Sequence, residues 1–458
     1  MARYQSSKCI LLAVMLLAFV AESSAAPPNI VLIMADDLGW SDLHCQGNDA
    51  LETPAIDKLA SQGMRFTDAY AAAPVCTPTR AAMMTGLAPA RLGITNHAPG
   101  NPDHVSKTTS LKGAQWTTYL SLEHRTLAER LRDTGYKTGF IGKWHLSHRP
   151  GSDQNGKFEP QLRPQHQGFD LNVGGCSKGG PPSYFEPYRI PNITPRRKGD
   201  YLPERLADEA IDFVKSTDGK PFFLCWWNYS VHYPIQAPEK LIEKYKQKKG
   251  VKRPAYAAMI EGMDTAIGRV LASLDDQKLS GETLVLFTSD NGSLFENLPL
   301  RESKGHLYEG GIRVPFMVRW PGHVKPGTLS SEPVVSMDVL PTLLNAAKID
   351  IENERFDGED LTPVLEQTSG LKRDALYFHY PNYAFHKQNR LGSVIRQGKY
   401  KLIDWHDSSP SELYDLENDL AEKTDLSSKM PSLAKDMEKK LGSWLKETDA
   451  TMPTKVNR

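Results

Sequence analysis

Acidic side chains that could hold a metal ion follow two apolar, β-branched runs of this chain. Asp36 and Asp37 come after the first run, and Asp290 and Asn291 come after a later one. Carboxylate and amide oxygens are the ligands that hard cations such as Ca²⁺ and Mg²⁺ prefer. Because an aspartate after a strand commonly caps a turn, each pair alone is weak evidence. The two pairs together, with the basic residues described next, favour a metal site.

A second group of candidate residues is basic. Lys143 and His145 follow an apolar run that ends at Gly142, which is not where an idle surface lysine is expected. A pocket that combines a divalent cation with several fixed cationic donors suits a tetrahedral oxyanion, either phosphate or sulfate. Residue types alone do not choose between these two anions. The complete basic set consists of Arg80, Lys143, His145, His232 and Lys304.

Cys76 is the candidate nucleophile. Proline is favoured in the first turn of a helix, so Pro78 and the helix-forming residues after it place Cys76 just before a helix N-terminus. Backbone amides and the helix dipole favour negative charge there. Two other interpretations stay open: a buried structural cysteine, which is the commonest fate of a free one, and a thiolate nucleophile supported by the same helix end.

The elements that must position these residues alternate between strands and helices. Apolar runs predict strands at residues 28–34, 138–141, 222–227, 283–288 and 314–320, and amphipathic patterns predict helices at residues 53–62, 127–134, 203–216, 254–274 and 337–346. This alternation indicates an α/β layered domain with a mainly parallel or mixed sheet. The polar candidates follow the strands, and ligands in such sheets bind at the carboxyl ends of strands, so we expect one shared pocket.

The pattern changes near residue 376. Short strands at 393–397, 399–405 and 412–416, followed by a helix at 432–447, predict a small antiparallel sheet with a helix. We therefore expect a catalytic domain at residues 26–375 and a C-terminal subdomain at 376–458. The long loops at 98–118 and 149–203 are expected to shape the substrate cleft.

Residues 1–25 have the pattern of a secretory signal peptide. Arg3 and Lys8 precede an apolar stretch at 10–20, and small residues follow it. The stretch is shorter than the roughly 20 residues that a spanning helix needs, so we expect cleavage rather than anchoring. The mature protein is then secreted or periplasmic, or lies in a lysosomal-type lumen in a eukaryote, without stable membrane association.

Charge and cysteine content narrow the function further. The 458 residues include 55 Lys+Arg and 55 Asp+Glu, and this balance argues against nucleic-acid binding, which needs a basic surplus. Cys9 lies in the predicted signal, and the other cysteines form no C-x-x-C pair that would indicate zinc. If Cys76 is modified, at most one disulfide can form among Cys45, Cys176 and Cys225.

The run Cys76-Thr77-Pro78-Thr79-Arg80 resembles the signature of the type I, formylglycine-dependent sulfatases. The pattern C-x-P-x-R alone would occur by chance in unrelated chains, whereas several motifs in one order would not. The similar motifs span nearly the whole mature chain. They are NIVLIMADDLG at 29–39, GFIGKWH at 139–145, SDNG at 289–292, Lys304-Gly305 leading into YEGGIRVP at 308–315, and ELYDL at 412–416.

The resemblance implies an alkaline-phosphatase-like fold with a large mixed central sheet flanked by helices. It also implies that a separate formylglycine-generating enzyme converts Cys76 to formylglycine (3-oxoalanine), whose hydrate carries two hydroxyls. One hydroxyl attacks sulfur, and the other is held in reserve. The ligands of one cation, usually Ca²⁺ with Mg²⁺ possible, are then Asp36, Asp37, Asp290, Asn291 and position 76 itself.

Roles for the remaining residues follow from the same resemblance. Asp290 is the expected base for the attacking hydroxyl, while Arg80 and Lys143 hold the hydrate. Lys143, His232 and Lys304 contact the sulfate, and His232 protonates the departing alcohol. His145 takes the proton of the reserve hydroxyl, which expels inorganic sulfate and restores the aldehyde.

Sulfatases of this kind cleave aryl sulfates and often sulfated sugars, so we expect a sulfuric ester hydrolase acting on a small sulfated carbohydrate or a glycan. The predicted loops carry polar and aromatic candidates for sugar contacts: His97, Asp103, His104, Trp116, His379, His386 and Arg390. One alternative is a phosphonate or phosphodiester hydrolase on the same scaffold. Another is a secreted protein that binds sulfated glycans without cleaving them. Because every catalytic position is present, catalysis is favoured over binding alone.

Overall fold

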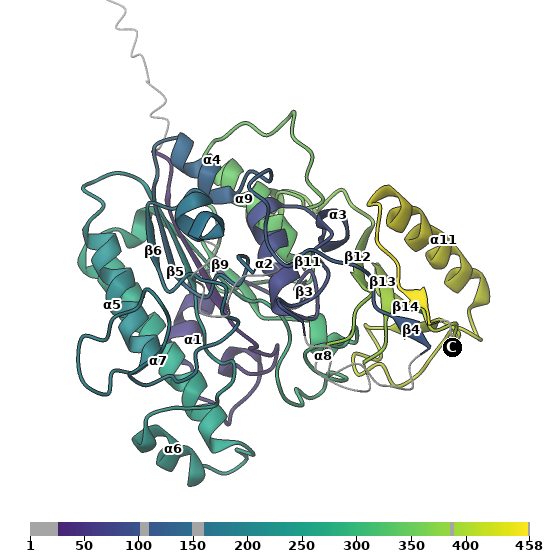
Figure 1. Ribbon diagram of the computed structural model, residues 1–458, viewed down its shortest axis with the longest axis horizontal. Coiled ribbons are helices and arrows are strands. Elements are labelled where there is room, and N and C mark those ends of the chain that lie inside the picture. The colour runs from purple at the N-terminus through teal and green to yellow at the C-terminus, as the bar shows by residue number, and fades with distance from the viewer. Residues whose placement is uncertain (1–25, 101–109, 149–159, 385–388, 457–458) are drawn as a thin grey trace, which may run out of the picture.

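An eight-stranded mixed sheet forms the centre of the molecule (Figure 1). The computed structural model describes residues 26–100, 110–148, 160–384 and 389–456, so the predicted signal peptide lies outside it. The strand order is β10 (Thr328–Ser330), β2 (Met64–Phe66), β9 (Phe316–Arg319), β8 (Thr283–Ser289), β1 (Asn29–Ala35), β7 (Phe222–Trp227), β5 (Lys137–Gly142) and β6 (Leu171–Val173). Strand β9 runs antiparallel to β8 and β2, whereas the other pairs are parallel. The predicted mixed sheet is confirmed.

Helices cover both faces of this sheet, as the buried runs require. Successive side chains of a strand point to opposite faces, so Val31 and Ile33 pack on one side while Ile30 and Leu32 pack on the other. The first side is covered by α1 (Pro54–Ser61), α5 (Leu202–Lys215) and α7 (Pro254–Asp276), and the second by α2 (Cys76–Thr85), α4 (Leu127–Asp133) and α9 (Val339–Ala346). The five predicted helices are all present.

A smaller antiparallel sheet follows in the C-terminal part of the chain. It consists of β12 (Ala375–Tyr380), β13 (Gly392–Gln397), β14 (Tyr400–Trp405) and β15 (Glu412–Asp415). Helix α11 (Pro431–Glu447) packs Met437 and Leu441 on one face of this sheet and lies on the outside of the molecule (Figure 1). The other face packs against Tyr308 and Ile312, at the two ends of the short helix α8 (Glu309–Ile312).

Several short elements were not evident from the sequence. The predicted loop at 149–203 contains β6 and the first two residues of α5, and β12 precedes the three predicted strands of the second sheet. Strands of two or three residues carry too few side chains to show a period of two. The other elements are η1 (His44–Gln46), β3 (Ala69–Tyr70), α3 (Pro89–Leu92), β4 (Leu111–Lys112), η3 (Pro160–Leu162), η4 (Pro164–His166), α6 (Glu239–Lys246), η5 (Ser280–Glu282), α8 (Glu309–Ile312), β11 (Val334–Val335), η6 (Ser336–Asp338), α10 (Thr362–Leu365) and β16 (Thr454–Lys455).

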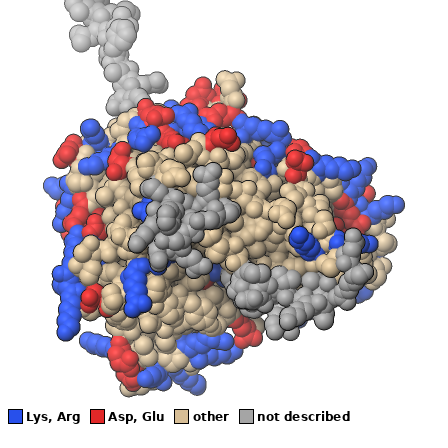
Figure 2. Space-filling view, in the orientation of Figure 1, with Lys and Arg blue, Asp and Glu red and all other residues tan. Residues whose placement is uncertain are grey.

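The surface carries both signs of charge. On the face shown in Figure 2, lysine and arginine side chains are interspersed with acidic ones around the outline, and the described residues in the middle of that face are mostly neither basic nor acidic. Among the described helices, none has the length and apolar character needed to cross a membrane. The four described cysteines, Cys45, Cys76, Cys176 and Cys225, are all free thiols.

Candidate active site

The carboxyl ends of two adjacent strands, β8 and β1, and of β5, which lies beyond β7, bring the predicted site residues together. Asp36 and Asp37 follow β1, Lys143 follows β5, and Asp290 follows β8. Lys143 Nζ lies 2.7 Å from Asp36 Oδ2, and Lys304 Nζ lies 2.6 Å from Asp37 Oδ1. These side chains are almost completely buried, so each charge depends on its neighbours rather than on water.

Helix α2 brings Cys76 and Arg80 to the same place. Cys76 is the first residue of the helix, as Pro78 predicts, and it is 2% exposed. Arg80, one turn later, donates from its Nε and Nη2 atoms to Asp290 Oδ2 at 3.0 and 2.7 Å. Its other terminal nitrogen donates to the carbonyl of Lys143 at 2.6 Å. Position 76 therefore lies at a helix N-terminus that is tied to two of the strand ends.

The acidic side chains fit a cation. Oxygen atoms of Asp36, Asp37 and Asp290 lie within 4.8 Å of one another. Three buried oxygens of this group accept no hydrogen bond from any described residue: Asp36 Oδ1, Asp37 Oδ2 and Asn291 Oδ1. Buried polar atoms are normally hydrogen-bonded. A bound divalent cation would be a partner for all three.

The charges around the acidic group affect its members differently. Burial alone would raise the pKa of Asp37, but Lys304, His232 and Lys143 outweigh it and hold that pKa well below its usual range. Burial also opposes ionisation of Asp290, yet Arg80 and Lys143 lower its pKa. The pKa of Asp36 is raised because burial exceeds the attraction of Lys143. A divalent cation would favour the charged form of all three carboxylates.

His145 is held as a proton acceptor that faces position 76. Its Nε2 atom lies 2.5 Å from the carbonyl oxygen of Ala98, which can only accept, so the ring proton belongs on Nε2. The other nitrogen, Nδ1, lies 3.3 Å from Cys76 Sγ. Burial, together with Lys143, holds the pKa of His145 well below its ordinary value. The imidazole is therefore neutral at neutral pH, and its Nδ1 lone pair faces Cys76 Sγ and the Thr77 hydroxyl, each at 3.3 Å.

Burial also raises the pKa of the Cys76 thiol, although Lys143 and Lys304 oppose this. The effect of burial exceeds that of the nearby cations. The structure therefore does not favour the thiolate interpretation of this residue.

His232 borders the opening of the site. Its side chain is 22% exposed, whereas Asp37 beside it is fully buried. The Nε2 atom faces Asp37 Oδ2 at 3.8 Å, and Nδ1 donates to the carbonyl of Tyr233 at 2.9 Å. Burial lowers the pKa of His232 to about 3, with Asp37 opposing this and Lys304 contributing to it. An anionic substrate would counter the effect of the lysines.

Comparison with known proteins decides the family. The "Sulfatase" family model matches residues 28–349, which is most of the chain. The chain belongs to the sulfatase family. A second model, described as "N-sulphoglucosamine sulphohydrolase, C-terminal", matches residues 303–448. The family assignment confirms that this sulfatase is a hydrolase of sulfate esters and implies a formylglycine and a divalent metal, for which the buried aspartates provide a fitting site.

Individual relatives agree with this. Human (Homo sapiens) arylsulfatase A is 35% identical over 424 residues, which cover 84% of this chain and 77% of the relative. Pig (Sus scrofa) N-acetylgalactosamine-6-sulfatase is 32% identical over 386 residues, with coverages of 77% and 68%. The solved structure of Ps i-CgsB has a TM-score of 0.77 at 30% identity and covers 92% of this chain and 93% of its own. The phosphonate monoester hydrolase of Agrobacterium radiobacter, at 20% identity and a TM-score of 0.67, shares the fold.

The structure adds contacts that motif reading of this sulfatase missed. A Cβ atom on Gly179 would lie 2.8 Å from the ring of His145, and one on Gly180 would lie 2.8 Å from the ring of His232. These two glycines therefore form the wall beside both imidazoles. Thr77 accepts from the Ala98 amide at 3.0 Å and so fixes the loop whose carbonyl orients His145. The pair Gly179-Gly180 is the sequence signal for this wall, but its position in the chain does not show which rings it contacts.

The proposed sugar-contacting residues are distributed unevenly. His97 is buried near the site, where its charge would affect His145, and Trp116 is half-buried against Gly100. His379 is 3% exposed, and its ring nitrogens already bond Ser393 Oγ and the Thr451 carbonyl.

His379 is therefore engaged within the C-terminal sheet, and this corrects the expectation that it contacts substrate. Arg390 is held by Asp407 and Glu412 and lies over the ring of Trp405, so its charge is already satisfied. Asp103, His104 and His386 lie outside the described residues.

Proposed function

We propose that this sulfatase removes sulfate from sulfated sugars by means of a formylglycine at position 76 and a bound Ca²⁺ ion. The observation that carries the proposal is the set of three buried, unpartnered oxygens on Asp36, Asp37 and Asn291, close to residue 76. All-oxygen sites suit Ca²⁺, and Mg²⁺ is the second choice. Two relatives support a sugar substrate: an N-acetylgalactosamine-6-sulfatase, and Ps i-CgsB, which is 30% identical and was solved in complex with k-i-k-neocarrahexaose.

The metal would be held by Asp36, Asp37, Asp290 and Asn291, where it would polarise the sulfate oxygens and favour ionisation of a hydroxyl on residue 76. The hydrate of formylglycine supplies one hydroxyl for attack on sulfur and a second that allows sulfate to be expelled. Asp290 accepts the proton of the attacking hydroxyl, while Arg80 and Lys143 hold the hydrate. These assignments match the short contacts among Arg80, Lys143 and Asp290.

Two histidines divide the proton transfers. His145 takes the proton of the second hydroxyl, because its Nδ1 lone pair already faces residue 76 at 3.3 Å. His232 donates a proton to the departing alcohol at the exposed side of the site. Sulfate bound beside Lys304 and His232 supplies the negative charge that raises the pKa of His232 from its low value, so that it can act as an acid.

Maturation precedes activity in this proposal. The signal sequence at residues 1–25 directs secretion, to the periplasm or to a lysosomal-type lumen, and a formylglycine-generating enzyme converts Cys76. Residues 26–375 then form the catalytic domain and 376–458 the C-terminal subdomain.

Hydrolysis of 4-nitrophenyl sulfate tests the proposed function. The protein, made together with a formylglycine-generating enzyme, is assayed with this ester and with the matching phosphate diester, and Cys76→Ala serves as the inactive control. We expect turnover of the sulfate that depends on added Ca²⁺ and a large preference over the diester. A preference for the diester, or equal activity of Cys76→Ala, would contradict the proposal.

A further inference from the structure

The part of the substrate that does not react must extend out of the site in one direction. Asp36, Asp37 and Asp290 are fully buried, and Lys304 is 2% exposed, whereas the His232 side chain is 22% exposed. The sulfate group therefore lies inside, and the alcohol part extends outward past His232. The next residue in the chain, Tyr233, is 52% exposed.

Tyr233 belongs to an aromatic platform, which we define as Tyr233, Phe295 and Arg253. The rings of Tyr233 and Phe295 meet edge to face at 6.1 Å, and the Arg253 guanidinium lies 4.4 Å from the centre of the Phe295 ring. Phe295 is only four residues beyond the metal-ligand candidate Asn291. The platform is therefore connected to the site on both sides, through His232 and through the segment after β8.

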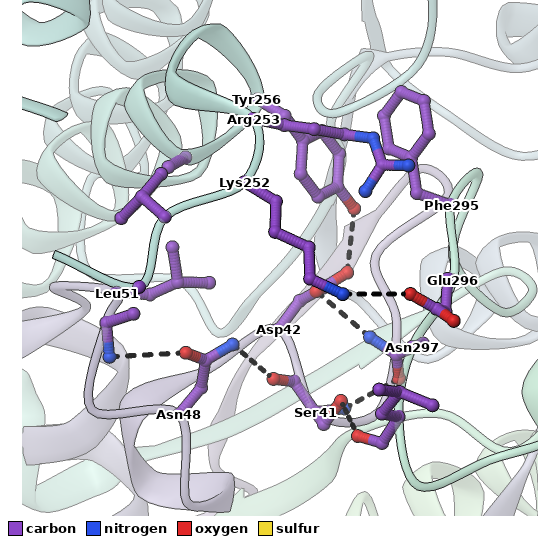
Figure 3. A pocket seen from close by; sticks show the side chains of 15 residues that line it. Ser41, Asp42, Asn48, Leu51, Lys252, Arg253, Tyr256, Phe295, Glu296 and Asn297 are labelled. Carbon is purple, nitrogen blue, oxygen red and sulfur yellow. Dashed lines mark hydrogen bonds and ion pairs between the residues drawn. The ribbon is translucent and has the colours of Figure 1, made fainter. Parts of the chain in front are cut away.

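Phe295 and Arg253 of the platform line a cavity of about 220 Å³ (Figure 3). Tyr256 forms part of its wall and packs its ring 5.0 Å from that of Phe295. The Tyr256 hydroxyl donates to Asp42 Oδ2 at 2.7 Å and lies 3.4 Å from the carbonyl oxygen of Asp37. The cavity thus lies directly behind a metal-ligand candidate, and its wall offers polar groups such as Ser41 that could bond sugar hydroxyls.

Arg253 differs from the lysine beside it. Lys252 Nζ is paired with Glu296 Oε2 at 3.1 Å, and both side chains are drawn meeting in Figure 3. Among the residues that the structure describes, no carboxylate pairs with Arg253, whose guanidinium lies against Phe295 instead. A guanidinium stacked on a ring keeps its N–H donors available at its edge, where they match a sulfate or a carboxylate.

We propose that the aromatic platform is a second subsite, which binds the sugar unit joined to the sulfated one. Tyr233 and Phe295 contact the apolar face of that sugar, and Arg253 binds an anionic group on it, either sulfate or carboxylate. Tyr233 and Arg253 both contact the Phe295 ring, at 6.1 and 4.4 Å, so the platform offers aromatic faces and one cation side by side. This inference rests on the proposed function and specifies its substrate as an oligosaccharide with at least two acidic groups.

Competition with 4-nitrophenyl sulfate tests the subsite. The two competitors are N-acetylgalactosamine 6-sulfate and a disaccharide in which glucuronic acid is joined to that sugar. For the wild type, we expect the disaccharide to inhibit about tenfold more tightly, because it adds a charge-assisted contact. Arg253→Ala should lose most of this difference, and Lys252→Ala, the matched basic neighbour, should retain it.

Equal inhibition by both sugars in the wild type, or an unchanged ratio in Arg253→Ala, would overturn the subsite. Tyr233→Ala against Tyr233→Phe gives a second measurement: only the alanine variant should bind the disaccharide more weakly. Failure of the proposed function is distinguishable, because the wild type with verified formylglycine would then not hydrolyse 4-nitrophenyl sulfate at all.

Discussion

Two buried groups of charges in this sulfatase differ in how completely their members are paired. In the active site, Asp36, Asp37 and Asn291 each keep a buried oxygen that accepts no hydrogen bond from a described residue. At the contact between the two sheets, a second group, the subdomain cluster, contains Tyr70, Glu309, Arg313, Lys401 and Glu422.

The subdomain cluster satisfies Glu309 without any ligand. Its Oε2 atom accepts from the Tyr70 hydroxyl at 2.8 Å and from Arg313 at 2.9 Å, while Oε1 accepts from Lys401 at 2.9 Å. Lys401 Nζ also lies 2.8 Å from Glu422. Burial alone would raise the pKa of Glu309, but Lys401 and Arg313 lower it to about 2.

The difference shows how to separate a structural charge group from a ligand site. Buried charges need partners, and where the protein supplies all of them, the group holds the fold together. Where the protein does not supply some of these partners, we infer that a ligand supplies them. The two groups are also linked, because Gly310 and Gly311 of α8, which Glu309 begins, pack against Gly292 next to Asn291.

Among the variants that test this comparison, a substitution at residue 76 should have the largest effect on activity. Cys76→Ser supplies one hydroxyl but lacks the second, so the enzyme can be sulfated but cannot expel sulfate by cleavage of a C–O bond. We expect turnover to fall by more than about 10⁴-fold, with a sulfated protein detectable by intact mass after incubation with substrate. Normal multiple turnover by this variant would contradict the mechanism.

Replacing an unpartnered carboxylate should remove the response to the cation. Asp37→Asn keeps the shape but removes a charged ligand, and we expect at least about 10²-fold lower activity. In the wild type, Ca²⁺ at 100 times its Kd should raise the free energy of unfolding by about 2.7 kcal/mol, measured by thermal unfolding with and without chelator. The exposed Asp49→Asn is the control and should respond as the wild type does. A full Ca²⁺ response in Asp37→Asn would show that the cation binds elsewhere.

Breaking the ion pairs of the subdomain cluster should affect stability instead. Lys401→Met leaves Glu309 and Glu422 buried without their shared cation, which should cost about 3–5 kcal/mol in denaturant unfolding. Lys399→Met, two residues away and partly exposed beside Asp415, should change stability little. If both variants have the same free energy of unfolding, the subdomain cluster does not stabilise the fold in the way that its ion pairs indicate.

The smallest effect concerns the pH dependence of stability. Burial raises the pKa of Glu422 to about 7, from an ordinary value of 4.5, although Lys401 opposes this. A folded-state pKa above the unfolded one gives stability that is present at low pH and is lost as pH rises from 4.5 through about 7. Between pH 5 and pH 8, the free energy of unfolding of Glu422→Gln should therefore fall by about 1–3 kcal/mol less than that of the wild type. The exposed Glu417→Gln should follow the wild type.

The sequence predicted the active site better than the subdomain cluster, for a physical reason. Asp36 and Asp290 follow recognisable buried strands, and parallel strands bring their carboxyl ends to one edge. Glu309 contacts Lys401, which is 92 residues away in the chain, and Glu422, which is 113 residues away. The spacing of these residues in the sequence does not predict those contacts.

For His379, the sequence predicted a substrate contact, whereas the structure shows a side chain engaged within a sheet. It was interpreted as a loop residue, but it lies in strand β12, and its pairing within the sheet uses both ring nitrogens. Polar character in an unassigned segment is therefore poor evidence for substrate contact. The platform residue Arg253 also went unnoticed, because its importance depends on the lack of an acidic partner in space.

Mass spectrometry of the proteolytic peptide that contains residue 76 tests the central claim most directly. The protein is made with and without a formylglycine-generating enzyme, and its specific activity on 4-nitrophenyl sulfate in Ca²⁺ is recorded for each preparation. The account predicts an aldehyde at residue 76 in the active preparation and activity proportional to the aldehyde fraction. Full activity in a preparation whose residue 76 is entirely unmodified cysteine would contradict it.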